Sequence, residues 1–315
     1  MKIQRIIYIW VQVTVCLFSA MSHAVPAMPS DPYSDQAYQT IKDYYHLNET
    51  LPRFEVEEVT FKTEGDYQLQ TVRIRVQGFP DAVLTLKMPH SFLAPLPAVV
   101  LFTGFQTGNQ AVQLVGDPEN VIYVGFQYPW PISYSTGSLL WDWHRMEVIP
   151  ILMAVSLAWL NEQPFINSNK INVVNVSFGT LFFPLAQRIL NNQGVFPRTT
   201  TFAYGGAGID EVISHQLQGK LGPLELIATK TLIRSQTWFV DPTFHLRHLG
   251  GPFLIVKGSE DTVFPPIASQ TLEKELRDPK TIITLPGSHI QPDKPELIRA
   301  FMFEVDKFLR ANQAK

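Results

Sequence analysis

The chain has 315 residues, of which 45% are hydrophobic and 17% are charged. This composition is ordinary for a globular protein with a large core, and it excludes a disordered chain. The formal net charge is -3 and the sequence has no run of lysine or arginine, so we expect no nucleic-acid partner. A small-molecule substrate with little charge suits this composition better, and the sequence leaves the oligomeric state open.

The first residues are typical of an export signal. Lys2 and Arg5 precede an apolar run over residues 6–17, and residues 22–24 provide small side chains at both positions that define a cleavage site. The run is shorter than the roughly 20 apolar residues that a spanning helix needs, so stable membrane insertion is not expected after cleavage. We therefore predict a signal peptide over residues 1–24, with an uncleaved anchor as the alternative.

Cys16 is the single cysteine of the sequence and lies inside that signal. The mature chain is thus expected to have no disulfide and no thiol nucleophile. Because no internal repeat is visible, we predict a single domain over residues 25–315. Its expected location is outside the cytoplasm, in a bacterial periplasm.

A change of pattern along the chain indicates the fold class. After a polar, proline-containing entry segment at residues 26–53, three stretches indicate antiparallel strands, the first two by alternating apolar and polar residues. Later runs are apolar without alternation, as in strands buried on both faces, and helix-like segments lie between several of them. We predict an α/β fold with a mostly parallel central sheet, an antiparallel N-terminal part and helices on both faces. The predicted strands are residues 55–62, 67–76, 82–88, 98–102, 121–126, 171–176, 199–204, 253–257 and 282–285, and the clearest helices are residues 147–160, 181–191 and 295–311.

Ser177 lies where an apolar strand runs directly into a predicted helix. A sharp strand-to-helix turn exposes a serine hydroxyl above the sheet and points the following backbone N–H groups at a developing oxyanion. Gly179 is one of the small neighbours that such a crowded turn needs, but Asn175 replaces the other usual glycine. Asparagine tolerates unusual backbone angles, so the turn can survive this change. The alternative is a serine that merely caps the helix.

Asp261 and His289 follow in the loops after two later strands. The acid would orient an imidazole, and the histidine would transfer protons near neutral pH. Glu260 is the competing acid, and a loop aspartate can also simply form a turn. His245 and His248 are competing bases, but they precede Asp261 and break the order serine, acid, histidine.

These residues, in this order, resemble the α/β-hydrolase superfamily over nearly all of the mature chain. Residues 158–160, 163–164 and 169–179 are similar to the dienelactone hydrolase and prolyl oligopeptidase-like branch. The resemblance implies Ser177 as nucleophile, His289 as base and Asp261 as its orienting acid.

The same resemblance implies an oxyanion hole formed by the backbone N–H groups of Phe105 and Phe178. Gln106 is the alternate donor for the first position. Thr103 departs from the family pattern, because many relatives have histidine there. The glycine that follows it in the pattern is present as Gly104.

The resulting expectation is a secreted serine hydrolase that cleaves a carboxylester or thioester through an acyl-enzyme. A serine peptidase is the enzymatic alternative, although the chain lacks the length for the propeller domain of such peptidases. A non-catalytic binding or scaffold protein is the other alternative, and Asn175 and Thr103 favour it.

Two segments are predicted to shape a pocket for an apolar or cyclic substrate, although aromatic residues more often serve core packing. No metal site is expected, since the histidines lack the His-Glu-x-x-His spacing, and no cofactor is expected because a dinucleotide-binding glycine fingerprint is missing. The two segments are residues 127–143, with Tyr128, Trp130, Tyr134 and Trp141, and residues 205–248.

Overall fold

The computed structural model describes residues 25–47, 50–104, 106–129 and 146–313. The predicted signal peptide at residues 1–24 lies outside the described residues. So do Phe105, Trp130, Tyr134 and Trp141.

Nine strands of the described residues form one mixed sheet in the order β1-β2-β3-β5-β4-β6-β7-β8-β9. The first three strands pair antiparallel, and β3 pairs antiparallel with β5. All remaining pairs, from β5 to β9, are parallel, which confirms the predicted fold class. The strands are β1 Phe54–Glu64, β2 Tyr67–Val76, β3 Ala82–Pro89, β4 Leu96–Phe102, β5 Ile122–Gln127, β6 Ile166–Val176, β7 Thr199–Ala203, β8 Phe253–Gly258 and β9 Lys280–Leu285.

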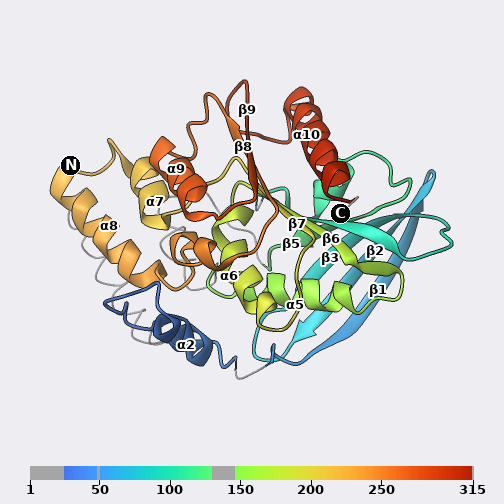
Figure 1. Ribbon diagram of the computed structural model, residues 1–315, viewed down its shortest axis with the longest axis horizontal. Coiled ribbons are helices and arrows are strands. Elements are labelled where there is room, and N and C mark those ends of the chain that lie inside the picture. The colour runs from blue at the N-terminus through green and yellow to red at the C-terminus, as the bar shows by residue number, and fades with distance from the viewer. Residues whose placement is uncertain (1–24, 48–49, 105, 130–145, 314–315) are drawn as a thin grey trace, which may run out of the picture.

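Helices cover both faces of the sheet, as predicted (Figure 1). The helices α5 and α6 pack on one face together with α7 and α9, whereas η1 and α10 lie on the other. Two short 3-10 helices, η2 and η3, lie between α8 and β8. The bounds are α2 Asp35–Tyr44, η1 Gly108–Gln113, α5 Ile149–Asn161, α6 Gly179–Asn191, α7 Ile209–Leu217, α8 Pro223–Thr237, η2 Pro242–Phe244, η3 Leu246–His248, α9 Pro266–Glu275 and α10 Pro295–Gln313.

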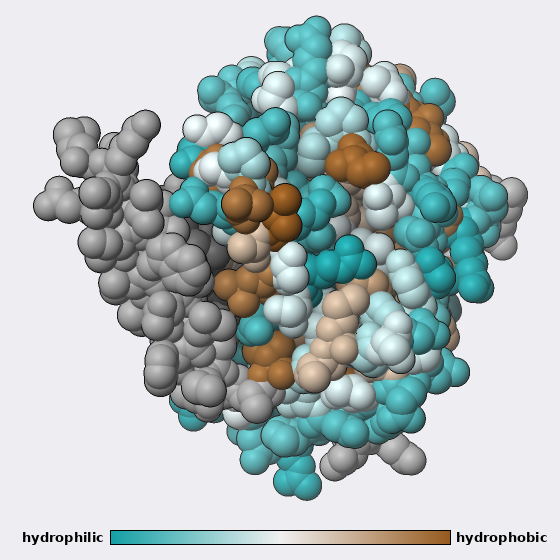
Figure 2. Space-filling view, turned by 90° about the vertical axis from the view of Figure 1, so that its left-hand side faces the viewer, coloured by the Kyte–Doolittle hydropathy of each residue, from teal (hydrophilic) through white to brown (hydrophobic). Residues whose placement is uncertain are grey.

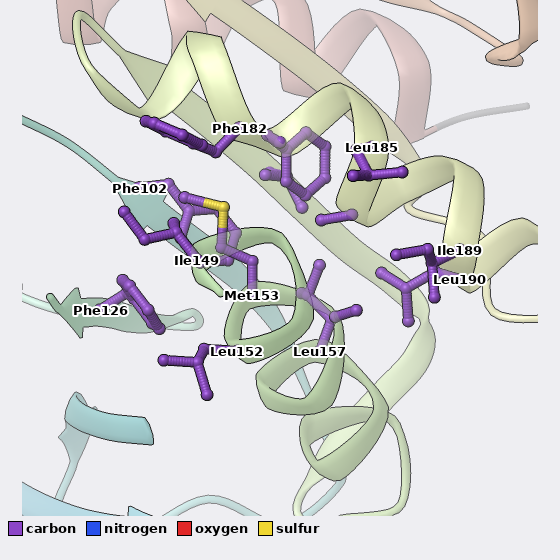
Figure 3. Close-up of a cluster of buried hydrophobic side chains, with 14 of the residues drawn as sticks. Phe102, Phe126, Ile149, Leu152, Met153, Leu157, Phe182, Leu185, Ile189 and Leu190 are labelled. Atoms are coloured by element: carbon purple, nitrogen blue, oxygen red, sulfur yellow. The ribbon is translucent and has the colours of Figure 1, made fainter. Parts of the chain in front are cut away.

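Successive residues of the central strands point into two different cores. Val100 and Phe102 of β4 join the cluster beneath α5 and α6, while Val99 and Leu101 join the cluster beneath α10. This alternation explains the unbroken apolar runs of the sequence, because both faces of each strand are buried. Figure 3 shows part of the first cluster, where Phe102 and Phe126 of the sheet pack together with side chains of α5 and α6.

The edge strand β9 differs from its prediction. It was predicted as a strand buried on both faces, but Ile282 is 43% exposed and most of the strand is accessible. The prediction is wrong because, among the described strands, β9 pairs with β8 alone and forms the edge of the sheet. At such an edge, alternate residues face solvent even when the apolar run looks continuous.

The described part of the entry segment, residues 26–47 and 50–53, is packed onto the domain. Its helix α2 begins after Ser34, whose hydroxyl accepts a hydrogen bond from the Ala37 N–H at 3.2 Å. The guanidinium of Arg188 lies 3.9 Å from the ring centre of Tyr38, and the Trp238 indole N–H donates to the Pro26 carbonyl at 2.7 Å. The segment is therefore part of the same packed body.

The helix α8 lies on the side of the molecule that Figure 2 presents. Hydrophobic residues occur there among predominantly hydrophilic ones, and Leu224 and Ile227 of α8 are exposed. Scattered exposed apolar side chains of this kind are common on protein surfaces. Within the described part of the chain, no helix combines the length and the apolar character that crossing a bilayer requires.

Candidate active site

Ser177 occupies the turn between β6 and α6 in a left-handed backbone conformation, with φ of 53°. Its N–H donates to the Ala203 carbonyl at 2.9 Å, and its own carbonyl accepts from the Thr180 hydroxyl at 2.6 Å. These bonds hold a strained conformation that is uncommon for residues other than glycine. A Cβ atom on Gly179 would collide with the Phe102 carbonyl oxygen, so glycine is required there.

The side chain of Ser177 does not cap α6. The residue at the N-cap is Phe178, and no side chain caps the helix there. The Ser177 hydroxyl lies instead 2.8 Å from Nε2 of His289. The interpretation of Ser177 as a helix cap is therefore wrong.

Asn175 has a different role from the one expected. It is a paired residue of β6 opposite Phe102 and Phe202, and its backbone does not have a positive φ. Its fully buried side chain donates through Nδ2 to the Thr201 carbonyl at 3.1 Å. The unusual backbone angle thus belongs to Ser177, and Asn175 instead joins two neighbouring strands.

The structure brings Ser177, His289 and Asp261 into one hydrogen-bonded row. Nε2 of His289 lies 2.8 Å from the Ser177 Oγ, and Nδ1 lies 2.8 Å from Oδ2 of Asp261. The other carboxylate oxygen of Asp261 accepts from the Val263 N–H at 2.8 Å. The acid is thereby fixed by its own loop and directed at the far side of the imidazole from the serine.

Two aromatic rings and one lysine surround His289. The Phe264 ring stacks on the imidazole at 6.0 Å between centres, and the Tyr204 ring meets its edge at 5.9 Å. Nζ of Lys294 donates to the His289 carbonyl at 2.9 Å. These contacts restrict the imidazole to the plane that reaches both the serine and the acid.

Tyr204 was not among the predicted site residues. It follows β7 with φ of 49°, and its buried hydroxyl lacks a hydrogen-bond partner among the described residues. Burial raises the pKa of Tyr204 to about 12, and the Asp261 carboxylate adds to this effect, so the hydroxyl stays protonated at neutral pH. The sequence carries no signal for this role, because the place of Tyr204 beside His289 results from tertiary packing.

The hydrogen-bonded row contains none of the competing residues Glu260, His245 and His248. Glu260 is exposed and its N–H donates to the Gly287 carbonyl at 2.9 Å. His245 is fully buried, with Nε2 2.9 Å from the Phe239 carbonyl oxygen. Burial lowers the pKa of His245 to about 3, and nearby Arg188 adds to this effect, so it stays neutral. Burial also lowers the pKa of His248.

The loop after β4 lies beside the start of α6. The Tyr128 hydroxyl donates to the Thr103 carbonyl at 2.7 Å, and the Tyr128 ring contacts Phe178 edge to face at 5.3 Å. Tyr128 was predicted to line the substrate pocket, but it is buried and does not line the cavity. It packs between the two loops that carry the expected oxyanion donors, because its ring and hydroxyl both find partners there.

A cavity of about 670 Å³ opens beside Ser177 and His289. Its volume is in the range of sites that bind small organic molecules. The predicted pocket segment at residues 205–248 contributes through α7, with Ile209, Val212 and Ile213 in the lining. Gln106, the alternate oxyanion donor, also lines the cavity. Across the described residues, no cluster of three or more histidine, cysteine or acidic side chains could hold a metal ion.

Comparison with known proteins gives similarity in structure only. No protein-family model and no curated protein sequence matches the chain. The acetyl xylan esterase from Paenibacillus sp. R4 superposes with a TM-score of 0.65 at 13% identity, covering 93% of this chain and 98% of that one. Acetyl xylan esterase 1 from Thermoanaerobacterium sp. JW/SL YS485 gives 0.59 at 13% identity, with coverages of 91% and 98%.

A cold-adapted esterase from an Arctic intertidal metagenomic library gives a TM-score of 0.55 at 13% identity, with coverages of 80% and 99%. At such identities the likeness establishes the fold alone. The chain has the α/β-hydrolase fold, as its sequence predicts. The neighbours are also consistent with the dienelactone hydrolase-like branch.

Proposed function

We propose that the protein is a serine hydrolase that cleaves carboxylic esters or thioesters. The observation that carries this proposal is the row of two 2.8 Å contacts from Ser177 through His289 to Asp261. The row lies at a strained strand-to-helix turn and faces an apolar cavity. Geometry of this kind is how a serine hydroxyl is activated as a nucleophile.

In the proposed reaction the Ser177 oxygen attacks the acyl carbonyl carbon while Nε2 of His289 takes the hydroxyl proton. Asp261 accepts from Nδ1–H and stabilises the imidazolium. The carbonyl oxygen, now an oxyanion, accepts hydrogen bonds from the Phe178 N–H at the start of α6 and from the Phe105 N–H. Collapse of this intermediate breaks the bond to the alcohol or thiol, which receives the proton from His289.

Water then repeats the sequence on the acyl-enzyme. His289 takes a proton from the water as its oxygen attacks the acyl carbon, and it returns that proton to the Ser177 oxygen as the acid leaves. The short contacts of His289 favour this enzyme over a non-catalytic scaffold. The esterases among the structural neighbours favour an ester over a peptide as the substrate.

We further propose that the enzyme acts outside the cytoplasm after removal of residues 1–24. The basic start, the short apolar run and the small residues before Val25 support this proposal. N-terminal sequencing of the protein isolated from its native compartment tests it, and an N-terminus at Val25 is the expected result.

Labelling with a fluorophosphonate probe tests the activated serine. We expect the folded protein to be labelled at Ser177 and Ser177→Ala to lose the label, with kcat for a simple ester falling by a factor on the order of 10⁴ or more. Ser235→Ala is the matched control and should keep the label, because this exposed serine of α8 does not line the cavity and its hydroxyl donates to the Leu232 carbonyl. A folded native protein that takes up no label would contradict the proposal.

A further inference from the structure

Most of the apolar lining of the cavity belongs to two separate clusters on opposite faces of the sheet. We name the two parts the α10 wall and the α7 wall. The α10 wall consists of Leu101, Val115, Val176, Ile290, Phe301 and Met302. The α7 wall consists of Phe178, Leu181, Ile209, Val212, Ile213 and Phe264.

Ser177 lies where these walls meet. The residue before it, Val176, belongs to the α10 wall, and the residue after it, Phe178, belongs to the α7 wall. His289 also lines the cavity, so the reacting groups have apolar surface on both sides. The polar lining residues that are exposed form the rim, and these are Gln106, Gln216, Lys220, Gln291 and Asp293.

This arrangement constrains both ends of a substrate. An acyl carbon bound to the Ser177 oxygen carries the acyl chain and the alcohol oxygen, which leave a tetrahedral centre in different directions. Each of them therefore meets one apolar wall. A hydroxyl-rich sugar on either side would lose hydrogen bonds to water without replacement, which disfavours it.

We propose, on the basis of the function proposed above, that the substrates are esters with apolar groups on both sides of the carbonyl. Alkyl and aryl esters of medium-chain acids belong to this class. The cavity of about 670 Å³ has room for such a molecule. This specificity differs from that named for the structural neighbours whose substrate is acetyl xylan.

Two substrate series test the proposal on the full mature chain. In the acyl series, 4-nitrophenyl acetate, butanoate and hexanoate should show kcat/KM rising about fourfold per added methylene. In the alcohol series, methyl, butyl and hexyl butanoate should show the same trend. Hexyl acetate should be hydrolysed at least about tenfold more efficiently than acetylated xylo-oligosaccharides.

Polar substitutions in each wall distinguish the contributions of the two walls to substrate preference. Met302→Gln on the α10 wall and Ile213→Gln on the α7 wall change half-buried residues, and we expect each to flatten a different one of the two series. Ile267→Gln on α9 is the matched control, since this exposed isoleucine does not line the cavity and should leave both series unchanged. Fluorophosphonate labelling of Ser177 in each variant verifies the site.

Several results would overturn the inference. One is a native protein whose kcat/KM does not change along either substrate series. Another is a preference for acetylated xylo-oligosaccharides. A third is that the two wall variants both leave the series unchanged, or that both flatten the same series. If Ser177 is labelled while any of these results is found, only the substrate class is wrong. If Ser177 is not labelled and no ester is hydrolysed, the proposed hydrolase function fails together with it.

Discussion

The backbone of Ser177 is strained, and this strain has a measurable consequence. A residue with a side chain at φ of 53° costs on the order of 1 kcal/mol more than glycine. We expect Ser177→Gly to be more stable than Ser177→Ala by about 1 kcal/mol, although both lack the nucleophile. Urea unfolding of the two variants measures this difference. Equal stability would mean that the turn relaxes to an ordinary conformation without its serine.

Asn175 stands where glycine is usual in this fold, yet glycine should not improve the protein. Asn175→Gly removes the hydrogen bond to the Thr201 carbonyl and leaves a small cavity between strands. We expect the free energy of unfolding to fall by about 1–2 kcal/mol, with no gain in kcat. Asn175→Ala separates loss of the side chain from the added backbone freedom. A variant with glycine that is both stable and more active would contradict this account.

At the scale of elements, α6 and β4 approach so closely that a methyl group does not fit between them. The Cβ of Gly179→Ala would collide with the Phe102 carbonyl and displace the start of α6, which carries Phe178 and follows Ser177. We expect a loss of about 3 kcal/mol or more in stability and much slower labelling of Ser177. Gly250→Ala is the control, because a Cβ there meets nothing within 4 Å.

The sequence predicted those strands whose pattern of apolar residues follows from burial alone. The parallel strands β4 to β8 were found because both of their faces are buried. The first part of β6, from Ile166, lacked this signal because residues 168–170 are exposed. Helix α2 was also missed, since its short apolar face depends on packing against segments that lie far away in the sequence.

The candidate site was predicted to a similar extent. Ser177, Asp261 and His289 follow strand ends in a fixed order, so their positions can be found without contacts. Tyr204 and the α10 wall could not be found in this way, because their place beside His289 results from the tertiary packing of β7 and α10. The expectation that Asn175 tolerates unusual angles failed because it assigned the strain to the wrong residue of the turn.

For the molecule as a whole, a buried carboxyl group should make stability depend on pH. Burial raises the pKa of Glu147 from 4.5 to about 7, and the Tyr44 hydroxyl only partly offsets this. Between these values the unfolded chain ionises while the folded chain stays protonated, so stability falls as the pH rises through this window. The loss above pH 7 is on the order of 3 kcal/mol at most.

Glu147→Gln tests this pH dependence. We expect the variant to gain stability relative to the native protein between pH 4 and pH 8, as measured by urea unfolding at several pH values. Glu162→Gln changes an exposed residue just after α5 and should give a constant difference. If the stability difference between Glu147→Gln and the native protein is also constant over this pH range, the Glu147 carboxyl has the same pKa in the folded and the unfolded chain, and the prediction is wrong.

The packing of residues 25–47 has a consequence for the order in which the chain can fold. Pro26 bonds to Trp238, which is 212 residues away, and the Tyr38 hydroxyl accepts from Asn192, which is 154 residues away. Closing loops of this length costs conformational entropy before the contacts repay it. Among the described residues, the segment that leaves the ribosome first must therefore wait longest for its partners.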